Sequence, residues 1–317
     1  MGSRRHPKRE GGRTPGSPRA RLALAAALSH VSPPRVKPFR TRPALMRPPW
    51  GGNRLAALGK GEGMIGETWE VWRENRLVAD DARRLADVLD FPVLVKLLDT
   101  SGVLSVQVHP DDALAVAEGA LHGKAEGWVV LHAEPGAQIA CGLRRELSRE
   151  ELRERALSGE IEADLAWFEP RAGDVFHVPP GTIHAIGAGI LLYEVQQPID
   201  LTYRLYDWGR PRELHLDRAI LAADLTPRDP RVAPRAISVS VERLLDTPNF
   251  ILERASLPTE ISGHSAVTLV EGSAEIAGES LSPGETLMLP AGDWVASGEG
   301  VVLIARPGHL RNGAESK

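Results

Sequence analysis

The fold is decided by residues 173–196, which read GDVFHVPPGTIHAIGAGILLYEVQ. Two runs of β-favouring residues in this stretch, Asp174–Val178 and Ile190–Gln196, are separated by segments rich in proline and glycine. A proline followed by a glycine, as at Pro180 and Gly181, builds a turn that reverses a strand. Short runs cut in this way are typical of the strands of a β-sandwich or a β-barrel.

The same pattern extends over residues 93–208, where helical periodicity is scarce. Further strands are predicted at Val93–Leu98, Leu104–Val108 and Gly127–Ala133. Helices are predicted at Asp111–Ala120, Ser148–Leu157 and His215–Leu221. The second of these opens with Ser148 and, three residues later, Glu151, the two residues of a capping box. We therefore expect a mainly β protein with a small helical insertion at about residues 145–165.

Residues 284–295 repeat the pattern of residues 173–184. A glycine, an acidic residue, a hydrophobic strand, a proline, a small residue and a glycine coincide at identical spacing, so one strand–turn–strand element is used twice. Chance similarity between two such turns is the alternative. The last position differs, because Val295 stands where the first copy has His184. If the first copy holds a metal, the second cannot use that ligand.

The charge of the chain is unevenly distributed along its 317 residues. Residues 1–46 hold 11 Lys or Arg and one acid, a balance of +10, so the remainder carries −14 to give the net −4. Such a start is typical of a transit peptide or a nucleic-acid-binding tail. The absence of interleaved aromatic residues argues against nucleic acid. We expect residues 1–35 to be a disordered basic extension or a misassigned start.

Composition excludes several classes of protein. A hydrophobic content of 42% is too high for a disordered chain, and no apolar run approaches the roughly 20 residues that span a bilayer. The single cysteine, Cys141, cannot form an internal disulfide, which favours a reducing, cytoplasmic compartment and nitrogen or oxygen ligands for any metal. A proline-rich segment at Asp224–Pro234 predicts a boundary between domains at residues 36–225 and 226–317.

Polar side chains that could bind a metal lie on several predicted strands. Alternate residues of a strand share a face, so Ser105, Gln107 and His109 point together. Glu126 and His184 come from other parts of the same β region. Two imidazoles, a carboxylate and an amide oxygen form a complete set of ligands for a first-row divalent ion such as zinc. For each residue alone, a hydrogen-bonded surface or core position is the alternative.

Several strings in the chain resemble the class I mannose-6-phosphate isomerases, a zinc-dependent branch of the cupin superfamily. The matching text is Trp50-Gly-Gly, Gly66-Glu67-Thr-Trp69, FPVLVKLLDTSGVLSVQVHPDD at 91–112, Gly123-Lys124-Ala-Glu126-Gly-Trp128, and residues 173–208. The resemblance covers residues 36–225 strongly and the remainder loosely. Departures are the 1–35 extension and Gly127, where a larger residue often stands in the family.

The resemblance implies a cupin jelly roll (double-stranded β-helix) over residues 36–225 as the metal-binding catalytic domain. It implies a second, smaller cupin-like domain without metal ligands over residues 226–317. One Zn²⁺ per chain would be held by Gln107, His109, Glu126 and His184. Catalytic roles would fall to Arg204, Glu194 and Lys124. Substrate-binding roles would fall to Ser105, Lys96, Asp200 and Trp50.

The implied reaction interconverts D-mannose 6-phosphate and D-fructose 6-phosphate through an enediol, within mannose, GDP-mannose and general carbohydrate metabolism. It needs a general base and a group that stabilises the developing oxyanion. The sequence does not distinguish Glu194, Lys124 and Asp200 as the base, and an internal ion pair is the alternative for each. The expected partner is a small phosphosugar, with no nucleic acid and no membrane, for a monomer or homodimer.

Two other functions share this residue set. A cupin oxygenase would use His109, His184 and Glu126 as an iron-binding facial triad. A non-catalytic sugar-phosphate-binding cupin would keep the metal and only bind its ligand. Three cations, Lys96, Lys124 and Arg204, argue against the oxygenase, because an uncharged substrate would not need them. An RNA-binding protein with an incidental cupin is a more distant alternative.

Overall fold

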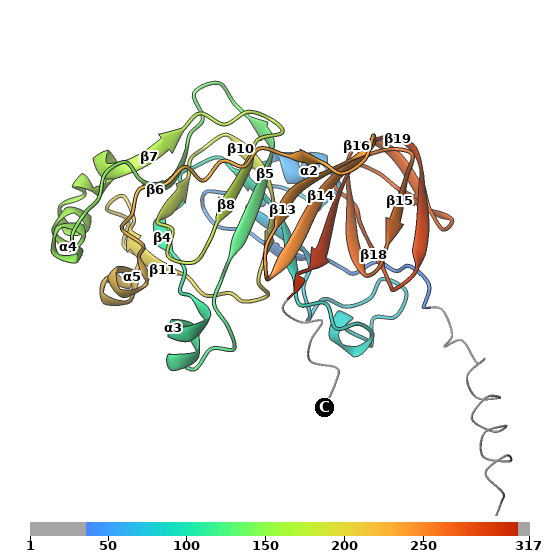
Figure 1. The fold of residues 1–317 in the computed structure, drawn as a ribbon, viewed down its shortest axis with the longest axis horizontal. Helices are drawn as coiled ribbons and strands as arrows, with labels where there is room; N and C mark the ends of the chain where they lie inside the picture. Colours follow the sequence, from blue (N-terminus) through green and yellow to red (C-terminus); the bar gives the residue numbers. More distant parts are fainter. Residues whose placement is uncertain (1–35, 310–317) are drawn as a thin grey trace, which may run out of the picture. The chain divides into compact units, whose positions relative to one another are not determined.

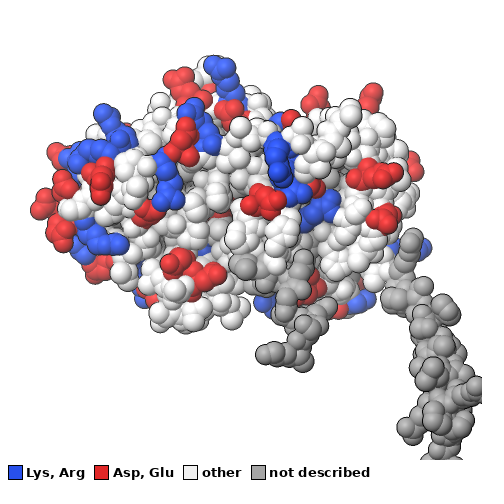
Figure 2. Space-filling view, in the orientation of Figure 1, with Lys and Arg blue, Asp and Glu red and all other residues white. Residues whose placement is uncertain are grey.

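The computed structural model describes residues 36–309, and those from Pro38 onward belong to one compact unit (Figure 1). The expectation for residues 1–35 lies outside the described residues. Within the described part the chain is mainly β and all its strand pairs are antiparallel. None of the helices found in residues 36–309 is long and apolar enough to cross a bilayer. Acidic and basic side chains are interspersed over the face shown in Figure 2.

Two facing sheets form the first β region. The first sheet has the order β1 (Ala44–Met46), β2 (Glu67–Val71), β3 (Leu94–Thr100), β10 (Ile190–Gln196), β5 (Glu126–Ala133), β8 (Val175–Val178). The second has the order β11 (Tyr203–Tyr206), β4 (Val106–Val108), β9 (His184–Ile186), β6 (Ile139–Leu143), β7 (Leu165–Phe168). Trp128 and Phe176 of one sheet share a buried cluster with Ile139, Cys141 and Ile186 of the other. Apolar faces from both sheets thus close on a common core.

The predicted strands are present, with small shifts at their ends. Ile190–Gln196 is confirmed to the residue as β10, and the strand predicted from Leu104 begins two residues later. The helix predicted from Asp111 is shorter, α3 (Asp112–Ala117), with the Asp111 side chain accepting a hydrogen bond from Leu114 N at 2.8 Å. It ends early because Gly119 adopts a left-handed φ of 87°, the conformation that stops a helix.

Helical segments cover the side of the second sheet that carries β11. The predicted capping box is present at α4 (Arg149–Ser158), where Ser148 and Glu151 exchange side-chain-to-backbone hydrogen bonds. The third predicted helix is α5 (Leu216–Ala222), and α4 and α5 pack against the same cluster of buried side chains. The short turn η2 (Glu160–Asp164) lies within the helical insertion expected at about residues 145–165. Short helical turns that the sequence did not indicate are α2 (Arg54–Ala57) and η1 (Leu85–Asp87).

The second β region is a separate sheet with its own core. Its strands are β12 (Arg235–Ala236), β13 (Val241–Asp246), β14 (Phe250–Ser256), β15 (Thr259–Ser262), β16 (Ser265–Ile276), β17 (Glu279–Leu281), β18 (Thr286–Leu289), β19 (Asp293–Pro307). The repeated sequence element forms β8–turn–β9 in the first region and β18–turn–β19 in the second. His184 is fully buried at the end of its copy, whereas Val295 is 63% exposed. The two copies therefore place their last residue in opposite environments.

The two β regions are in close contact. A Cβ added to Gly127 on β5 would lie 2.2 Å from Leu245 Cδ1 on β13, so the strands pack backbone against side chain there. The start of the folded unit also contacts the second β region, because Phe39 forms a β-bridge with Met288 on β18. The predicted linker runs along β8, where Arg231 bridges Phe176. The domain boundary at residues 225–226 stays a prediction.

Candidate metal centre and cavity

A cavity of about 210 Å³ opens between the sheets of the first β region. Eight of the eleven predicted site residues line it: Trp50, Ser105, Gln107, Lys124, Glu126, Glu194, Asp200 and Arg204. The other three, His109, His184 and Lys96, are buried beside lining residues. Strand pairing explains the convergence, because Gln107 on β4 stands opposite His184 on β9 and also opposite Arg204 on β11. Residues opposite each other in a sheet present neighbouring side chains.

A buried group of three side chains at the cavity can hold a metal ion. Ligand atoms of His109, Glu126 and His184 all lie within 4.8 Å of one another. Nε2 of His109 is 3.2 Å from Glu126 Oε1, and Nε2 of His184 is 3.9 Å from Oε2. Within residues 36–309, Oε2 is buried and has no hydrogen-bond partner. Because an unpaired buried carboxylate oxygen is costly, the group fits a bound cation.

Backbone carbonyls orient both imidazole rings toward this point. Nδ1 of His109 lies 2.9 Å from Leu201 O, and Nδ1 of His184 lies 2.9 Å from Thr182 O. A carbonyl only accepts, so each Nδ1 carries the proton and donates it, which leaves the Nε2 lone pairs facing Glu126. Metal-binding histidines are held by outer hydrogen bonds of this kind.

Gln107 completes the donor set with its side-chain amide. Its Nε2 lies 3.1 Å from His184 Nε2, while Ser105 Oγ donates to its Oε1 at 3.3 Å. A half-turn of the amide exchanges its nitrogen and oxygen, which brings an oxygen ligand to the three-residue group. The four predicted ligands are therefore brought together at one point.

Lys124 controls the charge of this group. Its Nζ lies 2.9 Å from Glu126 Oε1 and 3.4 Å from His109 Nε2. Burial alone would raise the pKa of Glu126, but Lys124 and His109 outweigh it and hold that pKa well below its usual range. Burial, reinforced by Lys124, lowers the pKa of His109 to about 3. An ionised carboxylate beside a neutral imidazole is the protonation state that binds a metal.

A second buried carboxyl, Glu194 on β10, has the opposite shift. Burial, followed by repulsion from Glu126, raises the pKa of Glu194 to about 7 although Lys96 opposes this change. Lys96 Nζ lies 3.0 Å from Oε1, and Trp128 Nε1 donates to Oε2 at 3.1 Å. Both partners stand opposite Glu194 on the neighbouring strands β3 and β5. Glu194 can therefore gain or lose a proton near neutral pH.

Comparisons with known proteins identify the family. No protein-family model matches the chain. A mannose-6-phosphate isomerase of Bacillus subtilis is 34% identical over 220 residues, which cover 58% of this chain and 67% of that protein. This chain belongs to the mannose-6-phosphate isomerase family. A relative from Streptococcus mutans is 46% identical over 157 residues, and the chain spans about half the length of this relative and of two more from Bacillus subtilis.

Solved structures of the mannose-6-phosphate isomerase family share the fold. The crystal structure of the Bacillus subtilis mannose 6-phosphate isomerase has a TM-score of 0.77 and 26% identity, covering 86% of this chain and all of that one. A zinc-bound mannose 6-phosphate isomerase has a TM-score of 0.72 at 16% identity, again over 86% of this chain and all of its own. The mainly β cupin fold expected from the sequence is confirmed.

The structure adds cavity residues that the sequence did not single out as a site. They are Glu67, Leu98, Leu104, Trp128, Ile186, Thr202 and Arg212. Glu67 and Trp128 stood within strings that matched the mannose-6-phosphate isomerase family, which was the available signal. Arg212 follows β11 in an irregular segment, where no strand or helix period marks a face. Lys96 is placed behind Glu194 rather than on the cavity wall, at 5% exposure.

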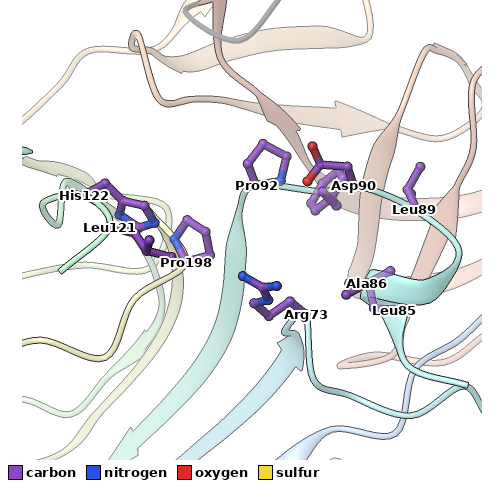
Figure 3. Close-up of a pocket in the computed structure, with 10 residues that line it drawn as sticks. Arg73, Leu85, Ala86, Leu89, Asp90, Pro92, Leu121, His122 and Pro198 are labelled. Carbon is purple, nitrogen blue, oxygen red and sulfur yellow. The ribbon is translucent and has the colours of Figure 1, made fainter. Parts of the chain in front are cut away.

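Another cavity, of about 480 Å³, lies apart from these residues (Figure 3). Its walls are the segment around η1, the loop before Lys124 and Pro198, and they are largely apolar. Figure 3 shows Arg73, Asp90 and His122 as its polar side chains. It contains none of the predicted site residues, so the smaller cavity is the candidate active site of this family member.

Proposed function

We propose that the protein is a metal-dependent aldose–ketose isomerase that interconverts D-mannose 6-phosphate and D-fructose 6-phosphate. The observation that carries this proposal is a single cavity that combines three groups. These are a buried His–Glu–His cluster, a carboxyl with a pKa of about 7, and arginines on the wall. Membership of the mannose-6-phosphate isomerase family supports the same reaction.

Zinc is the proposed ion, one per chain, held by Gln107, His109, Glu126 and His184. Nitrogen and oxygen donors with neutral imidazoles suit zinc, and a family structure of the same fold is zinc-bound. When bound, the ion supplies Lewis-acid stabilisation of the negative charge that develops on the sugar oxygens.

Glu194 is the proposed proton-transfer group for exchange between C1 and C2 of the sugar. A general base works best when its pKa is close to the working pH, and the pKa of Glu194 is about 7. Lys96 and Trp128 each hold one of its carboxylate oxygens, so the carboxyl is fixed beside the cavity. Lys124 is engaged with Glu126, which assigns it to orienting that carboxylate. Ser105, Asp200 and Trp50 line the space that the sugar would occupy.

The test combines metal analysis with a coupled isomerase assay. Metal-loaded protein is expected to convert mannose 6-phosphate, to lose activity when a chelator removes the metal, and to regain it with zinc. His184→Ala is expected to lose both metal and more than about a hundredfold of activity. His177→Ala is the matched control, because His177 lies on the preceding strand, outside the cavity.

Two results would overturn the proposal: no isomerisation by metal-loaded protein, or undiminished activity in His184→Ala. The elemental analysis also separates the alternatives, because iron in place of zinc would favour the cupin oxygenase. Tight sugar-phosphate binding without turnover would favour a non-catalytic binding protein. The cytoplasmic location, the monomer or homodimer, and the lack of a nucleic-acid or membrane partner remain predictions.

A further inference from the structure

Two arginines that line the cavity come from β11 and the segment after it. Arg204 lies on β11 opposite Gln107, close to the metal-binding group, and Arg212 lies eight residues later. The carboxyls of Glu67, Glu126, Glu194 and Asp200 also line the cavity. A negatively charged group of a ligand is therefore expected to bind at the arginines, where the cavity offers it positive charge.

Asp207 and Arg212 form a bidentate ion pair with two hydrogen bonds. Arg212 Nε donates to Oδ2 at 2.6 Å and Nη2 donates to Oδ1 at 2.6 Å, while the Asp207 side chain is 1% exposed. Such two-point pairs are strong and fix the plane of the guanidinium. Burial would raise the pKa of Asp207, but the hydrogen bonds from Arg212 and Arg210 outweigh it and lower that pKa. The two arginines thus favour the charged form of Asp207.

Arg210 shares the same carboxylate but has no nitrogen to spare. Its Nη2 donates to Asp207 Oδ1 at 2.6 Å, its Nε to Oδ1 at 3.1 Å, and its Nη1 to Val103 O at 2.9 Å. Arg212 differs, because within the described part of the chain its Nη1 has no hydrogen-bond partner. Arg212 lines the cavity and Arg210 does not. Every side-chain nitrogen of Arg210 is thus engaged by the protein, whereas Arg212 keeps one nitrogen without a partner among the described residues.

A strained turn brings these groups together. Trp208 has a left-handed φ of 55°, rare for a residue with a bulky side chain, and Gly209 continues with 71°. The indole Nε1 of Trp208 donates to Leu104 O at 2.7 Å, and Leu104 itself lines the cavity. Strain of this kind persists where surrounding contacts hold it, commonly at functional sites.

Arginines outnumber the buried carboxylates around Asp207. Arg210 and Arg212 share the carboxylate of Asp207, whereas Arg204 has no ion pair among the described residues and donates through Nη1 to Glu213 O at 2.6 Å. In residues 36–309 the buried Nε of Arg204 has no hydrogen-bond partner. Burial, then repulsion by Arg212, lowers the pKa of Arg204. A dianionic group would satisfy the free donors of Arg204 and Arg212 together and remove the repulsion between them.

We infer that Asp207 is a positioning residue, which holds Arg212 so that the free edge of its guanidinium and Arg204 together receive the phosphate group of the substrate. This inference rests on the proposed isomerase function. It places the sugar between the arginines that receive its phosphate group and the metal-binding group. Asp207 acts through Arg212 and touches neither the metal nor the reacting carbons.

The experiment compares Asp207→Asn and Arg212→Gln with Arg210→Gln as the matched control on the same carboxylate. Both test variants are expected to raise KM for mannose 6-phosphate by roughly 10- to 100-fold, the value of one charge-assisted hydrogen bond, with kcat changed much less. Arg210→Gln is expected to change KM by less than about threefold, because Arg210 does not line the cavity. A purely structural role would lower kcat and thermal stability without this selective rise in KM.

Calorimetric titration of the metal-loaded proteins with inorganic phosphate measures the subsite directly. The dissociation constant for phosphate is expected to rise in Asp207→Asn and Arg212→Gln by the same factor as KM. If the wild-type protein fails to isomerise the sugar but its phosphate affinity still depends on Arg212, the proposed function fails and the subsite stands. Unchanged KM and phosphate affinity in folded, metal-loaded Asp207→Asn would overturn the inference.

A conservative variant covers the case in which Asp207→Asn does not fold. Arg212→Lys keeps the charge but cannot form the two-point bond or present a fixed edge. It is expected to show the same rise in KM and in the phosphate dissociation constant. The inference would be refuted if Arg212→Lys bound phosphate as tightly as the wild type. It would also be refuted if Arg210→Gln and Arg212→Gln lost phosphate affinity equally.

Discussion

At the scale of single residues, the cavity contains two buried glutamates that differ in their partners. Glu126 has Lys124 at 2.9 Å and His109 at 3.2 Å, and its pKa is held well below the usual range. Burial, followed by repulsion from Glu126, raises the pKa of Glu194 to about 7 although Lys96 and Lys124 oppose this change. These opposite shifts suit the two roles proposed above, metal ligand for Glu126 and proton-transfer group for Glu194.

The pH dependence of kcat tests this division. The carboxyl of Glu194 must be ionised to accept a proton, so kcat is expected to fall as the pH drops through its pKa. That pKa is about 7, and a bound divalent ion lowers it, so the acidic limb should lie at or below pH 7. Glu194→Gln is expected to lower kcat by about 10²- to 10⁴-fold with the metal content unchanged.

Profiles of kcat against pH for the wild type, Glu194→Gln and Asp200→Asn discriminate the remaining candidates. An acidic limb that persists in Glu194→Gln but vanishes in Asp200→Asn would transfer the role to Asp200, which also lines the cavity.

At the scale of elements, strand β5 links the metal group to the second β region. Glu126 and Gly127 are adjacent on β5, so their side chains point to opposite faces of the sheet. On the Gly127 face, Leu245 of β13 and Phe250 of β14 approach so closely that a Cβ would lie 2.2 Å and 3.2 Å from them. The glycine that departs from the family pattern is therefore where the second region packs on the strand that carries the proposed metal ligand Glu126.

Gly127→Val is expected to lower the free energy of unfolding by about 1–3 kcal/mol, because the added methyl groups overpack this contact. Leu245→Ala alone leaves a cavity and is also destabilising, but in the double variant each change relieves the other. Denaturant unfolding of the two single variants and the double variant measures this coupling. Fully additive losses, or a Gly127→Val protein as stable as the wild type, would contradict the packing described here.

At the scale of the whole molecule, the start of the folded unit joins the two β regions. Phe39 exchanges two backbone hydrogen bonds with Met288, at 3.1 Å and 2.8 Å. Arg40 Nη1 donates to Glu285 Oε1 at 2.9 Å. Residues near Pro38 thus pair with β18 of the second β region, although they lie far from it in the sequence.

Two truncations test this arrangement. Removal of residues 1–35 is expected to leave kcat/KM and the unfolding temperature unchanged, because the compact unit begins at Pro38. Removal of residues 1–42 is expected to lower the free energy of unfolding by about 2–4 kcal/mol, since the hydrogen bonds of Phe39, Arg40, Thr41 and Arg42 and the packing of Phe39 against the core are lost. Thermal unfolding and the isomerase assay on both proteins provide the measurement. Equal stability of the two truncated proteins would show that residues 36–42 contribute nothing.

Features that depend on near neighbours along the chain could be predicted from the amino-acid sequence. Strand runs cut by proline and glycine predicted β8 and β10, and Ser148 with Glu151 predicted the start of α4. The proposed metal ligands could also be predicted, because the strings that contain Gln107, His109, Glu126 and His184 resemble a known family.

Features that depend on distance in space arise from the tertiary structure. It brought Gln107 opposite His184, raised the pKa of Glu194 by burial and by the charge of Glu126, and joined Asp207 to Arg212 across a strained turn. Charge interactions and desolvation act through space, so the same residues in an extended chain would have ordinary pKa values and no cavity between them.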